Sequence, residues 1–433
     1  MRMEQEQSKK RTWSRLAALP LVVACAAVPL GTLLSRFAGP GPENSPFLPW
    51  LVLAVLGTVH AILFRRSGQQ LRPRFFMELT MFAGLAAILA FYNKGIFHLL
   101  SDLTPFVPEL TPVVMLCFCK LWTISFGTPD RAAFQRWGAV LGLLCALDLA
   151  VEVFIYRAAP SLRWIGNADL LAGLLLVCLC ASLRPGPADN GLHEPAQGAP
   201  LFRALILAGL LATLSRTGLF AAAWIYLCFG RGGRIMRTAV FLACFAALSL
   251  TFLLPVTPSD LARYVDYWLW AKSMVLFTQS PSTLIAGLPL GHALPFTFPP
   301  EMVPVWERVT GASALFGAHL DQVSSFWLRL VLGWGAILPS VCLAGLFILL
   351  FRRPTRMGAG LAAVVLVQGM TTPLFYEPST GAVAGLALFL ALSASRNVPL
   401  SDRGQPVSGQ GPVPPIEPQP EDDPPRERDM RPL

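Results

Sequence analysis

Charged residues are scarce in this chain of 433 residues: they make up 14% of it, whereas about a quarter is normal for a soluble domain. Hydrophobic residues account for 54%. Apolar runs of about 20 residues, the length with which an α-helix crosses a bilayer, recur along the whole sequence. The runs are unbroken, whereas a membrane β-barrel would alternate apolar and polar residues. The sequence therefore predicts an all-α membrane protein.

Other features are missing as well, and each absence excludes a class of protein. All nine cysteines fall inside predicted membrane spans, so no disulfide framework is implied. The sequence has neither a nucleotide-binding nor a metal-binding motif, so we expect no cofactor and no metal. The net charge is +9, but lysine and arginine sit mostly in short loops, where membrane topology explains them. No nucleic acid partner is expected.

The apolar runs predict about twelve transmembrane helices. Their ranges are 16–34, 47–64, 75–92, 106–127, 138–156, 165–183, 202–214, 217–229, 238–255, 326–351, 358–373 and 379–394. Arginine-rich loops alternate with poorer ones, which by the positive-inside rule places both termini in the cytoplasm. A short N-terminal segment, 1–15, precedes a polytopic membrane domain, 16–396, with a large helix-containing periplasmic loop at 256–325. The Pro-, Asp-, Glu- and Arg-rich tail 397–433 is predicted to be disordered.

The apolar stretch 201–230 is too long for one untilted helix and is interrupted by Ser215-Arg216-Thr217-Gly218. We interpret it as two short spans that meet near a membrane face; a single long helix with a buried arginine is the alternative. An arginine within apolar sequence costs about 2.5–3.5 kcal/mol, so such a residue usually faces a cavity or an anion. The simpler explanation is that Arg216 snorkels to the surface. Ser215 is predicted to cap the second helix.

Arg263 opens the large loop, within the aromatic sequence Arg263-Tyr-Val-Asp-Tyr-Trp-Leu-Trp. Tyrosine and tryptophan suit a helix that lies in the membrane interface. Arginines on one face, here Arg216 and Arg263, would suit a diphosphate, because a guanidinium can hold two phosphate oxygens at once.

His319, just before the predicted span 326–351, could take a proton from a hydroxyl, because histidine titrates near neutral pH. Asp321 is its possible partner, and His292 is the competing histidine. Lys272 is a further candidate for the side of the site that would hold an acceptor.

Several short motifs follow one another along the chain. They are Gly166-Asn-Ala-Asp, Ser215-Arg-Thr-Gly, Arg263-Tyr-Val-Asp-Tyr-Trp, Ala286-Gly-Leu-Pro-Leu-Gly and Ala318-His-Leu-Asp-Gln-Val. In this order they resemble elements of the O-antigen ligase and polymerase family of bacterial membrane glycosyltransferases. Leu320 and Asp169 stand where the family has asparagine.

The resemblance implies transfer of a glycan from a polyprenyl diphosphate donor to an acceptor hydroxyl, in the lipid A core or a similar glycolipid or glycan. The reaction would take place at the periplasmic face of the bacterial inner membrane, among membrane lipids. Arg216 and Arg263, with Ser215, would bind the diphosphate, and His319 would orient or deprotonate the acceptor hydroxyl. Such a transfer requires neither a metal nor a cofactor.

Three alternatives stay open. A polymerase of the same family would use another polyprenyl-linked chain as the acceptor. A transporter could use Asp148 and Glu152, which lie four residues apart on one face of the span 138–156 and could form a proton relay or ion site. An inactive scaffold in polysaccharide export is the third alternative, favoured by the substitutions at Leu320 and Asp169.

Overall fold

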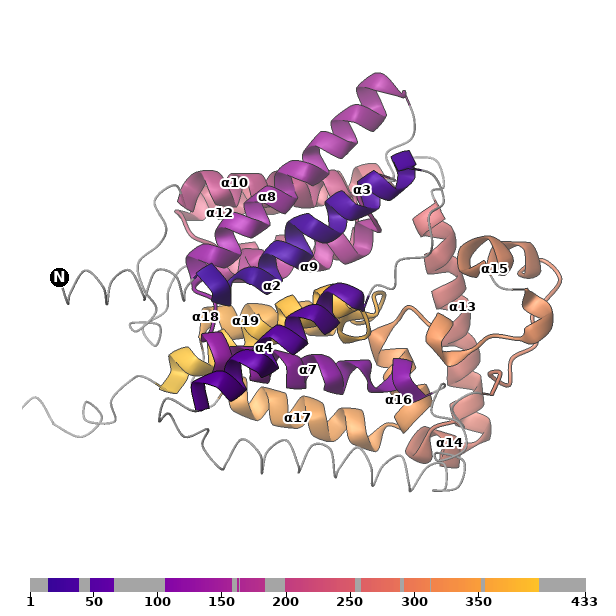
Figure 1. Cartoon of the computed structure of the whole chain (residues 1–433). Coiled ribbons are helices and arrows are strands. Elements are labelled where there is room, and N and C mark those ends of the chain that lie inside the picture. Colours follow the sequence, from indigo (N-terminus) through magenta and orange to yellow (C-terminus); the bar gives the residue numbers. More distant parts are fainter. Residues whose placement is uncertain are drawn as a thin grey trace, which may run out of the picture. The chain divides into compact units, whose positions relative to one another are not determined.

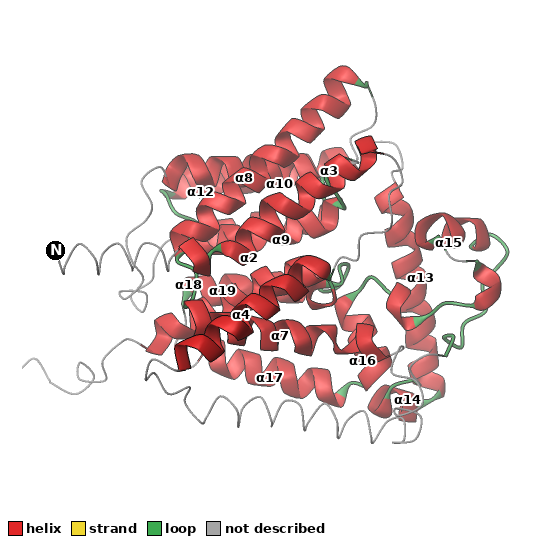
Figure 2. Cartoon of the chain, in the orientation of Figure 1, coloured by secondary structure: helices red, strands yellow, loops and turns green. Residues whose placement is uncertain are grey.

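The structure of the protein is a computed structural model that describes residues 15–38, 47–65, 106–157, 162, 164–183, 199–253, 258–288, 292–311, 313–351 and 355–396. At a few helical positions, Arg263 among them, it describes the backbone alone. The described residues form helices, turns and loops but no strand (Figures 1 and 2), which confirms the all-α prediction. Three predicted segments, 1–14, 75–92 and 397–433, lie outside the described residues.

The helices follow one another with short connections. The first are α2 (Leu19–Val22), the π-helical turn η1 (Val23–Ala27), α3 (Val28–Ala38), α4 (Leu48–Arg65), α7 (Phe106–Phe126), α8 (Arg131–Ala150), the π-helical turn η2 (Val151–Ile155), α9 (Ala168–Ala181) and α10 (Ala199–Thr213). The next are α11 (Arg216–Phe229), α12 (Arg234–Thr251), α13 (Pro258–Gln279), α14 (Pro281–Ala286) and α15 (Val303–Thr310). The last are the 3₁₀ turns η4 (Ala314–Phe316) and η5 (Leu320–Gln322), α16 (Phe326–Trp334), α17 (Ile337–Phe351), α18 (Arg356–Gln368), the 3₁₀ turn η6 (Leu374–Tyr376) and α19 (Pro378–Arg396).

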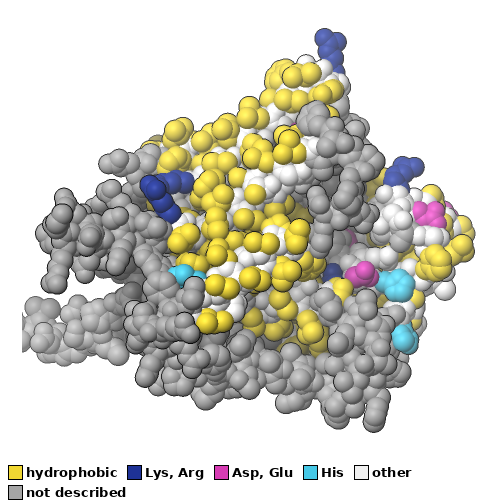
Figure 3. All heavy atoms as spheres, viewed as in Figure 1, with side chains coloured by type: hydrophobic (Ala, Val, Ile, Leu, Met, Phe, Trp, Pro, Cys, Tyr) yellow, Lys and Arg dark blue, Asp and Glu magenta, His cyan; other side chains and the backbone are white. Residues whose placement is uncertain are grey.

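Apolar helices make up most of the described chain. By length and composition, three helical stretches are long and apolar enough to cross a membrane: Pro108–Phe126, Arg131–Ile155 and Arg234–Thr251. The other apolar helices are shorter, with 10–17 residues each. On the face in Figure 3, apolar side chains cover the middle, and most of the visible acidic and histidine side chains lie to the right. These features are those of a membrane protein.

Polar residues set where several helices begin. Five described helices start after a residue whose side chain accepts a backbone N–H from the first turn: α8 after Asp130, α9 after Asn167, α11 after Ser215, α16 after Ser325 and α18 after Thr355. Each cap satisfies an N–H group that has no partner within the helix, and typically contributes about 1 kcal/mol. The cap at Ser215 separates α10 from α11, so the interpretation of 201–230 as two helices is confirmed.

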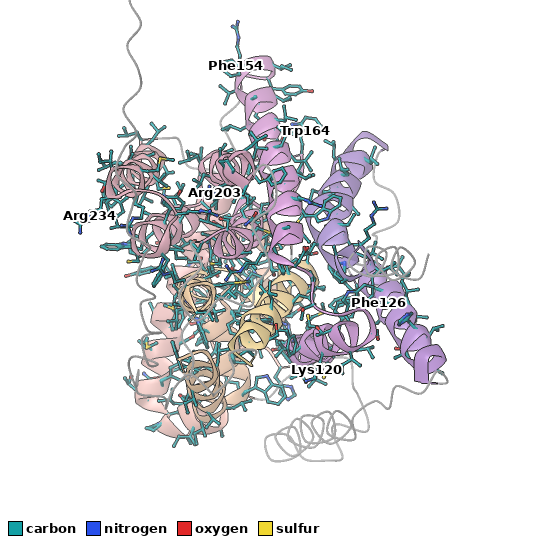
Figure 4. All side chains as sticks on the ribbon, turned by 90° about the vertical axis from the view of Figure 1, so that its left-hand side faces the viewer. Lys120, Phe126, Phe154, Trp164, Arg203 and Arg234 are labelled. Atoms are coloured by element: carbon teal, nitrogen blue, oxygen red, sulfur yellow. The ribbon has the colours of Figure 1, made fainter. Side chains whose placement is uncertain are left out.

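The central helix of the bundle is α9. Almost all of its residues are buried, and α8, α10, α11, α18 and α19 pack around it. Figure 4 looks along several of these helices, which appear nearly end-on. A helix that is apolar on every side is typical of such an interior position.

Glycine brings α8 and α10 into close contact. A Cβ atom at Gly142 would overlap the carbonyl oxygen of Leu205, and one at Gly209 would overlap the Cα of Gly142. Small residues allow this approach of backbones in membrane bundles. Beyond the contact, α8 continues into η2, and Phe154 lies at its projecting end (Figure 4).

The predicted span 326–351 is two helices, α16 and α17, so that prediction was wrong. The break lies at Gly335, which has a φ of 74°. A Cβ atom at Gly335 would overlap the backbone carbonyl of Ile285, and the Ala336 N–H donates to the Leu284 carbonyl at 2.6 Å. The chain breaks here because α14 packs directly against it, where only glycine fits both the space and the backbone angle.

A second apolar core lies in residues 258–334, which we call the cap. Its buried side chains are Val265, Leu269, Phe277, Leu294, Met302, Trp306, Ala318, Leu320, Val323, Leu328, Leu332 and Trp334. The ring of Trp268 stacks on Phe298 with centroids 5.0 Å apart, and Phe298 contacts Trp306 at 4.7 Å. In Figure 1, α13 runs crosswise to α7 and α17. The cap therefore contains most of the predicted loop 256–325 together with α16.

Candidate functional site

A buried hydrogen bond ties the start of α9 to the start of α11. Ser215 Oγ donates to Asp169 Oδ1, and the same oxygen accepts the N–H of Gly218 at 3.2 Å. Ser215 is fully buried and Asp169 nearly so. The bond joins two of the motifs that carry the family resemblance, 166–169 and 215–218. The Ser215 hydroxyl is thus engaged inside the bundle, where it positions the first turn of α11.

A chain of side-chain oxygens continues from Ser215 to the end of α18. Thr217 Oγ1 lies 3.5 Å from Ser215 Oγ, 3.4 Å from Gln368 Oε1 and 3.1 Å from Thr371 Oγ1. Gln368 is fully buried. Polar side chains inside a membrane bundle mark a functional site by default.

Arg216 is the first residue of α11, and its guanidinium lies at the end of α12. Nε donates to Thr251 Oγ1 at 3.2 Å and Nη2 to the Thr251 carbonyl at 3.1 Å. The guanidinium carbon lies 4.5 Å from the centroid of the Phe252 ring, and the side chain is half-buried. The start of a helix disfavours a cation, because the helix dipole is positive there. Arg216 therefore adds to the positive potential at the start of α11 and creates a place suited to an anion.

The turn between α18 and η6 connects this polar chain to the cap. Trp270 Nε1, from α13, donates to the Met370 carbonyl at 3.4 Å. Ser325 Oγ, at the start of α16, donates to the Gly369 carbonyl at 3.2 Å. The neighbouring Thr371 belongs to the chain of side-chain oxygens described above. The α18–η6 turn thus contacts α11, α13 and α16, so Arg216 and the cap lie at the same end of the bundle.

His319 immediately precedes η5. Its backbone N–H donates to Gln322 Oε1 at 2.9 Å, and its side chain is partly exposed. The segment that carries His292 runs beside it, because the Leu294 N–H donates to the Ala318 carbonyl at 2.7 Å. The structure thus places both candidate histidines on neighbouring segments of the cap, with His292 the more exposed.

The other predicted residues of the cap lie apart from one another. Asp321 is on η5, close to His319 in the chain, and its side chain is exposed. Lys272 is exposed on α13. Arg263 belongs to α13 as well, and its side chain lies outside the described residues.

An ion pair that the sequence analysis missed lies beside the His319 turn. Arg329 of α16 donates to Glu109 Oε1 of α7 from Nε at 3.0 Å and from Nη2 at 2.7 Å, and both side chains are buried. The Arg329 guanidinium carbon lies 4.0 Å from the centroid of the Tyr376 ring. Burial raises the pKa of Tyr376, and the Glu109 charge adds to this, so the hydroxyl stays neutral. The available signal was one acid and one arginine within otherwise apolar helices.

Asp148 and Glu152 are both buried, near the junction of α8 and η2. Glu152 Oε2 accepts the N–H of Leu162 at 3.0 Å, and Leu162 has a φ of 49°. Glu152 therefore stabilises the connection between η2 and α9. This contact accounts for the buried carboxylate without a transported ion.

Within the described ranges, no three His, Cys, Asp or Glu side chains form a group that could hold a metal ion. No family model matches the chain, and no curated protein matches it either. Any assignment of function therefore depends on the residues of the site and on the motifs that they form.

Proposed function

We propose that this protein transfers a glycan from a polyprenyl diphosphate to an acceptor hydroxyl at the periplasmic face of a bacterial inner membrane, as O-antigen ligases do. The observation that carries the proposal is the buried bond between Asp169 and Ser215. It unites two motifs separated by 46 residues and positions Arg216 at the start of α11.

The surroundings of Arg216 suit the diphosphate of such a donor. The N-termini of α9 and α11 meet at the Asp169–Ser215 bond, and the positive ends of helix dipoles favour anions. Arg216 adds a full positive charge that can hold phosphate oxygens. Arg263 is proposed as the second arginine, because α13 is bonded through Trp270 to the α18–η6 turn.

In the proposed reaction, the acceptor oxygen attacks the anomeric carbon of the first sugar. The bond from that carbon to the diphosphate oxygen breaks, and its electron pair leaves with the polyprenyl diphosphate. His319 receives the proton of the acceptor hydroxyl. Arg216 and Arg263 stabilise the charge that grows on the leaving diphosphate, which is electrostatic catalysis.

The proposed topology has about twelve crossings, both termini in the cytoplasm and the cap in the periplasm. The alternation of arginine-rich loops supports it. In the described part of the chain, the contacts that bring the starts of α9 and α11 to the ends of α12 and α18 fit such alternating crossings. A polymerase of the same family would use the same donor site and differ in its acceptor.

The experiment compares Arg216→Ala with Arg234→Ala in a strain whose chromosomal copy is deleted. Arg234 is a matched control, because it is exposed at the start of the neighbouring α12 and points outward (Figure 4). We expect Arg216→Ala to lower transfer by about 100- to 1000-fold, the usual cost of losing one group that stabilises transition-state charge. Surface glycan on gels and polyprenyl-linked glycan in lipid extracts measure the effect.

With Arg216→Ala at wild-type membrane levels, long-chain surface glycan should be lost and polyprenyl-linked chains should accumulate. Long accumulated chains would indicate a ligase, and single repeat units a polymerase. If Arg216→Ala restores the surface glycan that the deletion loses, as Arg234→Ala is expected to do, the transferase proposal is wrong. The transporter and scaffold alternatives would then be favoured.

A further inference from the structure

We propose that the buried pair of Glu109 and Arg329 positions the His319 turn for reaction with the acceptor, an inference that rests on the glycan transfer proposed above. The link is a single hydrogen bond: Arg329 Nη1 donates to the backbone carbonyl of Asp321 at 3.2 Å. Asp321 is two residues beyond His319 on the same turn. Glu109 and Arg329 are positioning residues, since they act through this bond and not by contact with substrate.

The Arg329 guanidinium is itself held firmly. Glu109 Oε1 binds Nε and Nη2, and the Tyr376 ring covers the guanidinium face. These contacts come from α7, α16 and η6, three elements far apart in the sequence. Because the guanidinium is planar and rigid, fixing two of its nitrogens also fixes the direction of the third. Nη1 is therefore directed at the Asp321 carbonyl.

The His319 turn depends on this bond at its centre. Its two flanks are anchored by burial, with Ala318 and Val323 almost fully buried. Between them the Asp321 side chain is exposed, so its carbonyl is the atom that connects the middle of the turn to the interior. Without the bond the flanks would stay in place and the centre could shift. A misplacement of about 1 Å at a reacting group can cost roughly 100-fold in rate.

The test must remove the bond without leaving a buried charge. Truncating one partner strands the other charge and strongly destabilises a protein, whereas replacing both with apolar residues of similar volume is often neutral. The first variant is therefore the double replacement Glu109→Leu with Arg329→Met. Arg329→Lys is the second, because lysine keeps the charge beside Glu109 but lacks the rigid fork. Arg308→Met, which removes an exposed arginine of the cap, is the control.

Full-length protein is purified in detergent and assayed with the lipid-linked glycan extracted from the deletion strain and with core lipopolysaccharide. Each substrate is varied while the other is held constant. We expect the double variant to unfold at the wild-type temperature and to transfer roughly 10- to 100-fold more slowly, with an unchanged KM for the donor. An unchanged donor KM separates positioning of the acceptor side from a general structural loss. Arg329→Lys should show a smaller loss of the same kind.

Two outcomes distinguish this inference from the proposed function. If Arg216→Ala is inactive while the double variant and Arg329→Lys both transfer at the wild-type rate, the positioning role is wrong and the transferase proposal stands. If Arg216→Ala also transfers at the wild-type rate, the transferase proposal is wrong and this inference with it. If the double variant does not fold, Arg329→Lys alone decides: a wild-type rate overturns the inference and a reduced rate with unchanged donor KM supports it.

Discussion

The bundle and the cap are stabilised by different kinds of contact. In the bundle, α9 is buried along almost its whole length, and Gly142 brings the backbones of α8 and α10 together. In the cap, much of the core is a stack of rings formed by Trp268, Phe298 and Trp306. The bundle thus depends on the approach of helix backbones, whereas the cap depends on a few large side chains.

This difference bears on where the proposed reaction could take place. The donor-side residues, Ser215 and Arg216, start a helix of the closely packed bundle. The acceptor-side residue, His319, lies on a turn of the cap. Functional residues commonly sit on connecting segments that a rigid scaffold positions. The α18–η6 turn and Arg329 link the two regions, so they set the distance between the two halves of the proposed site.

The largest expected effect comes from removing the ring at the centre of the cap. Trp306 is fully buried. Trp306→Ala should cost the cap about 3–5 kcal/mol, as is usual when a buried aromatic residue is truncated. Because the ring belongs to the cap core, amide hydrogen exchange should accelerate in peptides from 258–334 and stay unchanged in α9 and α10. Exchange measured by mass spectrometry on detergent-solubilised protein tests this.

Trp306→Phe is the matched control for that substitution. It keeps an apolar ring and removes an indole N–H that has no hydrogen-bond partner among the described residues. We expect exchange close to wild type in this variant. Equal acceleration of α9 peptides in Trp306→Ala would show that the cap and the bundle unfold as one unit, and the comparison drawn above would be wrong.

A smaller effect should follow from an added methyl group where α8 meets α10. In Gly142→Ala the new Cβ would overlap the Leu205 carbonyl oxygen, so the two helices must separate. Overpacking of this kind typically costs about 1–3 kcal/mol. The unfolding temperature of the purified protein should fall, as measured by tryptophan fluorescence on heating.

Gly173→Ala provides the comparison within the same bundle. A Cβ atom at Gly173 would have no atom within 4 Å, although the residue lies in the buried helix α9. Alanine favours a helix over glycine by up to about 1 kcal/mol, so this variant should be as stable as wild type or more so. A matching loss in both variants would mean that the close contact of α8 and α10 is not what makes Gly142 sensitive.

The sequence predicted features that depend on local pattern. The break in 201–230 was predictable because Ser215 is a good cap and Arg216 interrupts an apolar run. The position of the α16–α17 break was not predicted, because it arises where Gly335 meets Ile285 of α14. That contact exists only once the cap has folded.

The ion pair shows a second limit of local reasoning. Glu109 and Arg329 are separated by 220 residues, and each alone resembles a charged residue that reaches the surface near a helix end. Their pairing depends on α7 and α16 lying side by side, which no periodicity encodes. The proposed donor side was therefore partly visible in the sequence as the Ser215-Arg216 motif, whereas the residues that hold the His319 turn were not.

The smallest expected effect concerns Glu377, between η6 and α19 beside the bundle core. Burial raises the pKa of this carboxyl, partly offset by a hydrogen bond from the Ser379 backbone, so folding favours the protonated form. The stability contributed by protonation is fully present below the ordinary glutamate pKa of about 4.3, and is lost as the pH rises through the higher value of the folded state. Glu377→Gln keeps a hydrogen-bond acceptor and removes this titration. The variant should therefore unfold at a higher temperature than wild type at pH 7 and at the same temperature below about pH 4. Thermal unfolding at both pH values checks this, and a difference that grows as the pH falls would mean that the folded protein favours the charged carboxylate instead.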